Sequence, residues 1–190
     1  MAEPTVRRWT LADLDTPPDY DGWVRYEIID GELFELHAPG NAHQETCTLT
    51  GFELELWNRQ ARLGTVLTGP ELIFSDEDNT IPDLVWVSHA RRAALEQADD
   101  KLHGGPELVV EVLSPGAENE RRDREVKLRL YGRRGVDEYW LLDPTARTAT
   151  VYRRRRDALA LVAVLDAAAT LTSPTLPGFA ASVAAFFPVQ

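Results

Sequence analysis

The apolar run ELVVEVL at residues 107–113 is the segment that most constrains the fold. It is rich in β-branched side chains and is apolar at both alternating positions, which is typical of a strand buried on both faces. A second run of this kind, LVWV, lies at residues 84–87. Since helical patterns separate these and other strand-like runs, the sequence predicts an α/β fold with a mixed central β-sheet flanked by helices.

An N-terminal β-hairpin is expected over residues 24–37. Two strand-like runs there flank Asp30 and Gly31, and an Asp-Gly pair is a strong signal for a two-residue hairpin turn. Pairing across that turn sets Glu27 opposite Phe34, on the apolar face of the hairpin. A carboxylate on an apolar face is out of place and needs an explanation.

A long helix is predicted from residue 43 to residue 63, with Asn41 as its cap and Gly64 as its terminator. Four apolar residues recur there at helical spacing: Leu49, Phe52, Leu56 and Leu63. The other elements follow from composition and turn residues. Strands are expected at 65–67, 71–74, 137–142, 148–152 and 159–165, helices at 91–98 and 118–134, and loops at 75–80, 103–106 and, as a basic hairpin turn, 153–156.

The length of 190 residues suits one domain, which we expect at residues 23–190 after an N-terminal extension of residues 1–22 with a short helix. Turn residues at 16–22 separate the two parts. A single cysteine, Cys47, excludes an internal disulfide, suggests no zinc ligand set and fits a reducing cytoplasm. No apolar run approaches the roughly 20 residues that span a bilayer, so we expect a cytoplasmic protein outside the membrane.

The formal net charge of −11 bears on possible partners. Nucleic-acid-binding proteins usually carry a basic surface, so this acidity counts against avid, non-specific DNA binding. It does not exclude a metal-dependent nuclease, because local basic patches can oppose the mean field. Three such patches are present, at residues 121–122, 133–134 and 153–156.

Two carboxylates stand in or beside the buried strand runs. Asp83 follows Pro82 at the start of one run, and Glu111 lies inside the other. An ionised carboxylate in such a place is costly unless it is paired or binds a metal, and magnesium and manganese prefer oxygen ligands. Alternatively, Asp83 caps a turn and Glu111 pairs with an arginine.

The helix after Glu111 carries Asp123, Lys127 and Tyr131 at intervals of four, so these side chains share one face. Val126 and Leu130 lie beside that face, which therefore looks toward the sheet. The alternative is an exposed Asp123–Lys127 ion pair, worth only about 0.3–0.5 kcal/mol.

Several motifs occur in a fixed order: YEIIDGEL around Glu27, then His43-Gln44, IPDLVWV around Asp83 and PELVVEVLSPG around Glu111. D-x3-K-x3-Y from Asp123 to Tyr131 and GVDEYWLLDP at residues 135–144 follow. This ordered set resembles the Uma-type restriction endonuclease family of the PD-(D/E)XK nuclease superfamily, over nearly the whole chain. The resemblance implies a restriction-endonuclease-like sheet with the metal-binding acids at the ends of two adjacent strands.

The resemblance implies a role for each matching residue. Asp83 and Glu111 are the catalytic metal ligands, and Glu27 is an extra acid that completes the metal shell or, alternatively, a hairpin-edge acid paired to an arginine. The superfamily lysine usually sits two residues after the second acid, where this chain has Leu113, so its role passes to Lys127 on the following helix. His43 is expected to contact a phosphate or a metal-bound water, Ser114 to bond a carboxylate or a phosphate, and Asp123 and Tyr131 to align Lys127. The alternatives are a helix cap or surface residue for His43 and a simple turn role for Ser114.

The sequence therefore predicts a Mg²⁺- or Mn²⁺-dependent DNA endonuclease that hydrolyses phosphodiesters. Two alternatives stay open: a catalytically inactive nuclease-fold module with a binding or regulatory role, and a hydrolase of smaller phosphate esters. A homodimer is expected, since a cut in both strands needs two active centres.

Overall fold

The computed structural model describes residues 7–15 and 24–189, and its centre is a six-stranded sheet in the order β11-β10-β9-β8-β6-β3. Only β8 and β9 pair in parallel within it, so the sheet is mixed, as the sequence predicts. Its strands are β3 (Gly64–Thr68), β6 (Leu84–Ser88), β8 (Leu108–Val112), β9 (Glu138–Asp143), β10 (Thr148–Arg155) and β11 (Ala158–Leu165).

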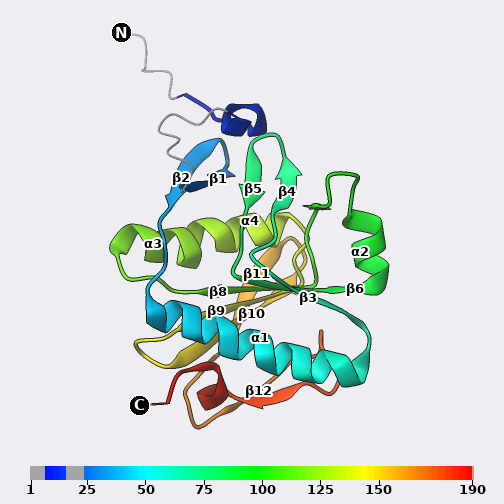
Figure 1. Cartoon of the computed structure of the whole chain (residues 1–190), viewed down its shortest axis with the longest axis vertical. Coiled ribbons are helices and arrows are strands. Elements are labelled where there is room, and N and C mark those ends of the chain that lie inside the picture. The colour runs from blue at the N-terminus through cyan, green and yellow to red at the C-terminus, as the bar shows by residue number, and fades with distance from the viewer. Residues whose placement is uncertain (1–6, 16–23, 190) are drawn as a thin grey trace.

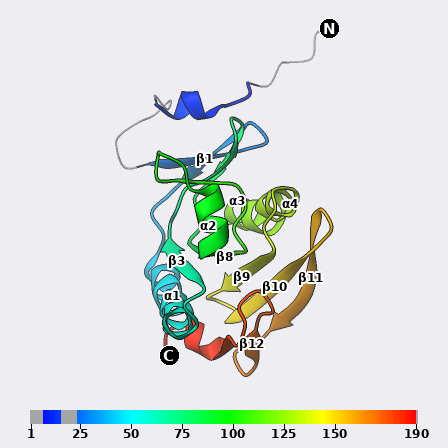
Figure 2. The ribbon, with the colours of Figure 1, turned by 90° about the vertical axis from the view of Figure 1, so that its right-hand side faces the viewer.

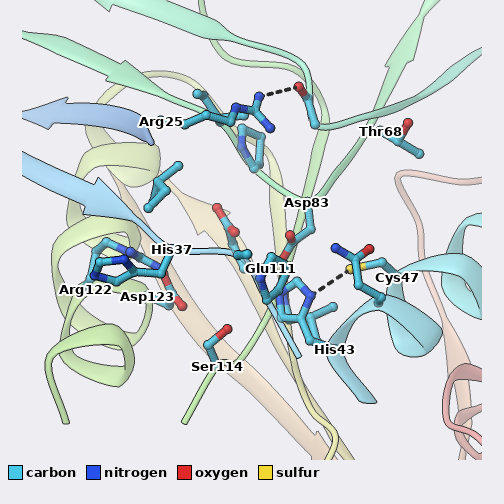
Figure 3. Close-up of a pocket in the computed structure, with 18 of the residues that line it drawn as sticks. Arg25, His37, His43, Cys47, Thr68, Asp83, Glu111, Ser114, Arg122 and Asp123 are labelled. Atoms are coloured by element: carbon cyan, nitrogen blue, oxygen red, sulfur yellow. Dashed lines mark hydrogen bonds and ion pairs between the residues drawn. The ribbon is translucent and has the colours of Figure 1, made fainter. Parts of the chain in front are cut away.

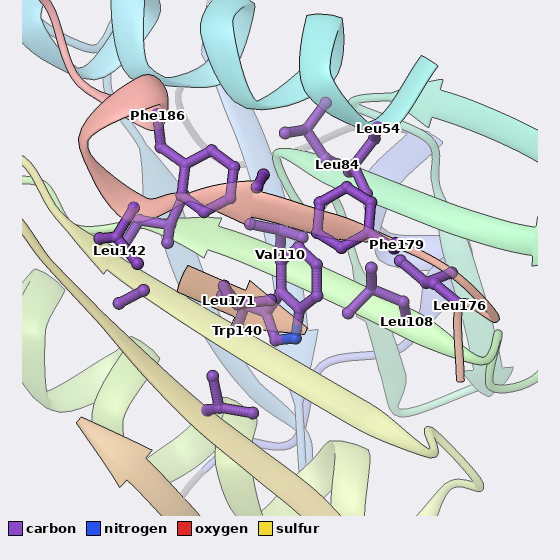
Figure 4. Packing of buried hydrophobic residues seen from close by; sticks show 14 of the residues in the cluster. Leu54, Leu84, Leu108, Val110, Trp140, Leu142, Leu171, Leu176, Phe179 and Phe186 are labelled. Carbon is purple, nitrogen blue, oxygen red and sulfur yellow. The ribbon is translucent and has the colours of Figure 1, made fainter. Parts of the chain in front are cut away.

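Two layers cover this sheet, one on each face (Figures 1 and 2). The long helix α1 (Asn41–Ala61) and the C-terminal segment, with β12 (Thr170–Thr172), β13 (Ala180–Ser182) and η3 (Val183–Phe186), cover one face. A helix at residues 117–133 covers the other. Figure 4 shows the core on the α1 side, where Leu54 of α1, Trp140 of β9 and Phe186 of η3 pack together.

A second, five-stranded sheet, β2-β1-β5-β4-β7, lies beyond the central sheet, toward the top of Figure 1. Its strands are β1 (Arg25–Ile29), β2 (Glu32–Leu36), β4 (Leu72–Ser75), β5 (Asp78–Thr80) and β7 (Leu102–His103). The predicted hairpin is confirmed as β1 and β2, with Glu27 opposite Phe34. Asp30 and Gly31 have φ angles of 53° and 76°, as a type I′ turn requires.

The loop predicted at residues 75–80 is wrong, because this segment contains β5, buried between β1 and β4. Its polar side chains have partners from other elements. Asn79 Oδ1 accepts a hydrogen bond from the Ile28 N–H at 2.8 Å, and Asp78 pairs with Arg134. Burial of these residues depends on groups distant in sequence, which hydropathy does not reveal.

The boundaries of α1 differ from the prediction. The helix starts after Gly40 and ends at Arg62, a left-handed residue with φ of 53°, while Gly64 is already the first residue of β3. The apolar spacing that predicted this helix does not mark its buried face, since Phe52 and Leu56 are 60% and 48% exposed. The buried positions are His43, Thr46, Thr50, Leu54 and Asn58.

The predicted helix at residues 118–134 is present but changes its winding. It consists of α3 (Ala117–Arg121), a π-helical turn η2 (Arg122–Lys127) and α4 (Leu128–Arg133). Such π turns are rare and often occur at functional sites. The hydroxyl of Tyr139 on β9 donates to the carbonyl of Asp123 at 3.0 Å, so the π turn is tied to the sheet.

The basic run at residues 153–156 is not the solvated hairpin turn that the sequence predicts. Residues 153–155 belong to β10, and only Arg156 lies in the turn. Arg153 Nε donates to Glu138 at 3.2 Å, and Arg154 pairs with Asp137 at 3.3 Å. Two of the four arginines are therefore occupied by acids of the same chain.

The described N-terminal residues pack on the five-stranded sheet. The N–H of Trp9 donates to the Gly31 carbonyl, and η1 (Leu11–Asp15) begins with a bond from its first N–H to the Asp76 carbonyl. The turn predicted at residues 16–22 lies outside the described residues, and the division between residues 22 and 23 stays a prediction.

A short helix α2 (His89–Leu95) follows β6. Among the helices described, none has the length and apolar character needed to cross a membrane.

Candidate active site

Asp83 and Glu111 lie at the same level of two neighbouring antiparallel strands. Leu84, the first residue of β6, pairs with Val110 of β8, and Asp83 and Glu111 are the residues next to this pair. Glu111 shares its face of the sheet with Val109, which packs against the helix at residues 117–133, whereas the Asp83 carboxylate contacts His43 of α1. The Val112 N–H donates to Asp83 Oδ2 at 2.7 Å and holds that carboxylate beside Glu111.

Lys127 of the π turn lies between carboxylates from both sheets. Its Nζ is 2.8 Å from Glu27 Oε1 and 2.9 Å from Glu111 Oε1, and 3.8 Å from Asp123 Oδ1. These four residues are at most 4% exposed. The alternative of an exposed Asp123–Lys127 pair is therefore excluded, and the four residues form one buried ionic cluster.

Tyr131 contacts Glu111 rather than the lysine that it was expected to align. Its hydroxyl donates to Glu111 Oε1 at 2.8 Å and lies 3.3 Å from Thr80 Oγ1. Burial, then the nearby Glu111 and Glu27 carboxylates, raise the pKa of Tyr131 well above its usual value. The phenol therefore keeps its proton and acts as a donor that orients Glu111.

A cavity of about 500 Å³ opens in front of the buried cluster (Figure 3). Glu111, Asp123 and Lys127 line it together with Asp83, so the buried acids are accessible to a ligand. Ser114, two residues after β8, also lines the cavity, and its bond to a carboxylate or a phosphate stays a prediction. Basic and neutral groups complete the lining, among them Arg25, His37, His43 and Arg122.

His43 is the third residue of α1, whose N-cap is Gly40, and it is only 9% exposed, so neither alternative for this residue, helix cap or surface residue, holds. Its Nε2 lies 3.2 Å from Asp83 Oδ2. The other ring nitrogen, Nδ1, lies 3.5 Å from the Sγ of Cys47, one helical turn further along α1. A contact of His43 with a phosphate or a metal-bound water stays a prediction.

The ionic cluster shifts the pKa of both its lysine and its central acid. Burial raises the pKa of Glu111 to about 8, against the lowering effect of Lys127 and with further raising effects of Asp83, Asp123 and Glu27. Burial alone would lower the pKa of Lys127, but Glu111, Glu27 and Asp123 outweigh it and raise that pKa above its usual value. Lys127 therefore remains an ammonium group at neutral pH.

Arg122 is a site residue that the sequence did not single out, because it was grouped with Arg121 as a basic patch. Its Nε lies 3.0 Å from Asp123 Oδ1 and 3.8 Å from Glu27 Oε2, and its side chain is 12% exposed. Burial alone would lower the pKa of Arg122, but the charges of Asp123 and Glu27 outweigh this effect and raise that pKa above its usual value. Its position beside Asp123 in the D-x3-K motif was the available signal.

The residues around the cavity fit a divalent cation with oxygen ligands. Together with Asp83 and Arg122, the buried ionic cluster contains four carboxylates and two fixed cations, which leaves a formal excess of two negative charges. The carboxylates are Glu27, Asp83, Glu111 and Asp123, and the cations are Arg122 and Lys127. In addition, Glu27 Oε2 is buried without a hydrogen-bond partner among the described residues. Mg²⁺ and Mn²⁺ prefer such carboxylate oxygens.

The fold places this protein in the restriction-endonuclease-like class. It matches the crystal structure of a "putative nuclease belonging to DUF820" from Anabaena variabilis ATCC 29413 with a TM-score of 0.72, at 17% sequence identity, over 94% of this chain and 97% of that one. The model of the Uma2 family, described as "Putative restriction endonuclease", matches residues 14–184, so the chain belongs to the Uma2 family. The search of curated proteins found no match to this chain.

Proposed function

We propose that this protein is a divalent-metal-dependent DNA endonuclease that hydrolyses phosphodiester bonds. One observation carries the proposal: Asp83, Glu111 and Lys127 line one cavity, with the Asp83 carboxylate held by the N–H of Val112, the residue after Glu111. Membership of the Uma2 family supports nuclease chemistry in general. The metal dependence and the DNA substrate are the parts that experiment must test.

In this proposal Asp83 and Glu111 hold Mg²⁺ or Mn²⁺. When bound, such an ion polarises a phosphoryl oxygen and lowers the pKa of a coordinated water. The excess of negative charge in the cluster supports this role, because each additional ionised acid in a buried site needs a compensating cation. Glu27 joins the ligands through Oε2, which has no hydrogen-bond partner among the described residues, or keeps the Lys127 ammonium in place through Oε1.

Lys127 acts through its charge and not as a general base. Its raised pKa keeps it protonated at neutral pH. A buried ammonium beside the scissile group stabilises the negative charge that develops on the phosphoryl oxygens in the transition state. Tyr131 keeps Glu111 in position by donating to its Oε1 at 2.8 Å.

Basic side chains at the cavity support a nucleic acid substrate despite the acidic composition. Arg25 and His37 are exposed at the cavity, and Arg122 lies deeper beside Asp123. Phosphate oxygens are commonly bound by such groups, which position the backbone without reading its sequence. We therefore propose that the scissile phosphate enters between these groups and the acids.

The test is cleavage of supercoiled and branched DNA by the full chain with Mg²⁺, Mn²⁺ or a chelator. We expect Asp83→Asn and Glu111→Gln to abolish measurable nicking, and Lys127→Met to lower it by about a hundredfold or more. Glu118→Gln is the matched control, since it makes the same carboxylate-to-amide change on an exposed residue of the neighbouring helix. Thermal unfolding of each variant checks that it is folded.

The outcomes separate the alternatives. Nicking that persists in Asp83→Asn, or that a chelator does not affect, contradicts the proposal. DNA or protein binding without cleavage, insensitive to chelator, identifies a catalytically inactive binding module. Metal-dependent hydrolysis of bis(p-nitrophenyl) phosphate without any cleavage of DNA identifies a smaller phosphodiester as the substrate.

A further inference from the structure

Beside the acid cluster, three potential metal ligands of different chemistry converge. They are His43 and Cys47 from successive turns of α1, and Asp83 from the residue just before β6 (Figure 3). One ligand atom from each can be chosen so that all three lie within 4.8 Å of one another. Because α1 presents residues at i and i+4 on the same face, the histidine and cysteine are fixed together by the helix itself.

The spacing is close to what one small ion requires. Cys47 Sγ lies 3.5 Å from His43 Nδ1, and His43 Nε2 lies 3.2 Å from Asp83 Oδ2. Ligand atoms bound to one tetrahedral ion at about 2.0–2.3 Å lie roughly 3–4 Å apart. The two contacts use different ring nitrogens of His43, so binding of one ion requires the imidazole to turn until a single nitrogen faces the sulfur and one Asp83 oxygen, all of which lie within 4.8 Å of one another.

The ligand types also select the class of metal. A thiolate and an imidazole favour a borderline or soft ion such as Zn²⁺ or Co²⁺ over Mg²⁺, which prefers oxygen ligands alone. Three protein ligands leave a fourth position, and all three residues line the 500 Å³ cavity, from which water or a phosphate oxygen can reach that position.

We propose that His43, Cys47 and Asp83 form a second metal site, specific for a Zn²⁺-like transition ion, next to the site of Asp83 and Glu111. The inference rests on the proposed function only in that both sites share Asp83. Binding converts the Cys47 thiol to a thiolate and releases its proton to solvent, while no bond to carbon changes. Without a metal the thiol stays protonated, because burial and the Asp83 and Glu111 charges raise the pKa of Cys47.

Titration of the full chain with Co²⁺ tests this site by absorption spectroscopy, because a cobalt–thiolate bond gives a charge-transfer band in the near ultraviolet. The chain has one cysteine, so any such band reports Cys47. We expect the band in the wild type and its displacement by one equivalent of Zn²⁺. We expect no band in Cys47→Ser and a Co²⁺ affinity at least about tenfold lower in His43→Ala. Glu45→Gln, on an exposed position of α1, should keep the band and the Co²⁺ affinity of the wild type.

Absence of the band in the wild type overturns the proposal without depending on any variant. The proposal is also overturned if His43→Ala and Asp83→Asn change neither the intensity of the band nor the Co²⁺ affinity, because Cys47 then binds cobalt without the other two residues. Labelling of Cys47 by a thiol reagent gives an independent measurement: Zn²⁺ should slow it in the wild type, and equal rates with and without Zn²⁺ contradict the site. None of these results depends on nicking, so this inference and the endonuclease proposal can fail separately.

Discussion

Glu111 is the residue on which the proposed chemistry depends most directly. Lys127 and Tyr131 both donate to its carboxylate, and the N–H of Val112 binds the carboxylate of Asp83. A carboxylate ligand must be ionised to hold a metal. Burial raises the pKa of Glu111 to about 8, so much of it is protonated at neutral pH when no metal is bound.

The affinity for Mn²⁺ should therefore depend on pH. Below a pKa of about 8 the cation displaces a proton from Glu111, and affinity falls as pH falls, by up to about tenfold per pH unit. Above that pKa Glu111 has no proton to lose, so the Mn²⁺ affinity no longer changes with pH because of this group. Calorimetric titration with Mn²⁺ between pH 6 and pH 9 measures the slope. A flat profile in the wild type, or the same slope in Glu111→Gln, contradicts this assignment.

At the residue scale, the sequence was informative where a side chain contradicts its surroundings. Glu27, Asp83 and Glu111 stand out as acids in or beside apolar strands, and the structure brings them to one cluster. Arg122 and Cys47 were missed because neither contradicts its local pattern. Their importance comes from Asp123, Glu27 and His43, and contacts across elements cannot be read from a single chain.

At the scale of elements, α1 shows why a helix can be predicted while its buried face is not. Thr46 donates to the carbonyl of Ala42 at 2.8 Å, and Asn58 bonds to Trp86 and to the Gly64 carbonyl at 3.0 and 3.1 Å. These bonds make polar side chains acceptable against the sheet. Hydropathy instead points to the exposed Phe52 and Leu56.

This difference leads to a paired prediction on α1. Leu54→Ala should lower the free energy of unfolding by about 2–5 kcal/mol, because Leu54 is fully buried between α1 and the sheet. Phe52→Ala, which removes a larger side chain that is 60% exposed, should change it by no more than about 0.5 kcal/mol. Urea unfolding of both variants gives the comparison. Equal losses would mean that the apolar spacing marks the buried face after all.

At the scale of the whole molecule, Glu138 ties the C-terminal segment to the central sheet. This fully buried carboxylate accepts from Trp140 Nε1 at 2.7 Å, Arg153 Nε at 3.2 Å, Ser173 Oγ at 2.9 Å and Thr175 Oγ1 at 3.1 Å. It belongs to the GVDEYW motif on which the family resemblance rests. The structure therefore gives this motif a role in holding one layer of the fold on the sheet.

Glu138→Ala should lower the free energy of unfolding by about 3 kcal/mol or more, because it leaves buried donors and a partly buried guanidinium without their acceptor. Glu120→Ala is the matched control: its ion pair with Arg124 is exposed and should be worth less than about 1 kcal/mol. Denaturant titration followed by tryptophan fluorescence measures both. A loss for Glu138→Ala no greater than that of the control would contradict this role.

Fold class and element order were predictable at this scale because strand composition and turn residues are local signals. The second sheet was not, since β5 is polar and its side chains are bound by groups from other elements, among them Ile28, Asp30 and Arg134. The acid cluster spans both sheets, with Glu27 from one and Glu111 from the other. Its assembly therefore depends on a docking that no local pattern encodes.

The π turn at Arg122–Lys127 has one more consequence. The helix that contains it runs from β8 to β9, and β9 holds it by the bond from Tyr139 to Asp123. Losing a single residue from this turn would rewind it as ordinary α-helix and swing Lys127 by about 100° around the axis. The ammonium would then leave its acids with no change in amino-acid type. Chain length at this turn is thus as much a determinant of the chemistry as the identity of the lysine.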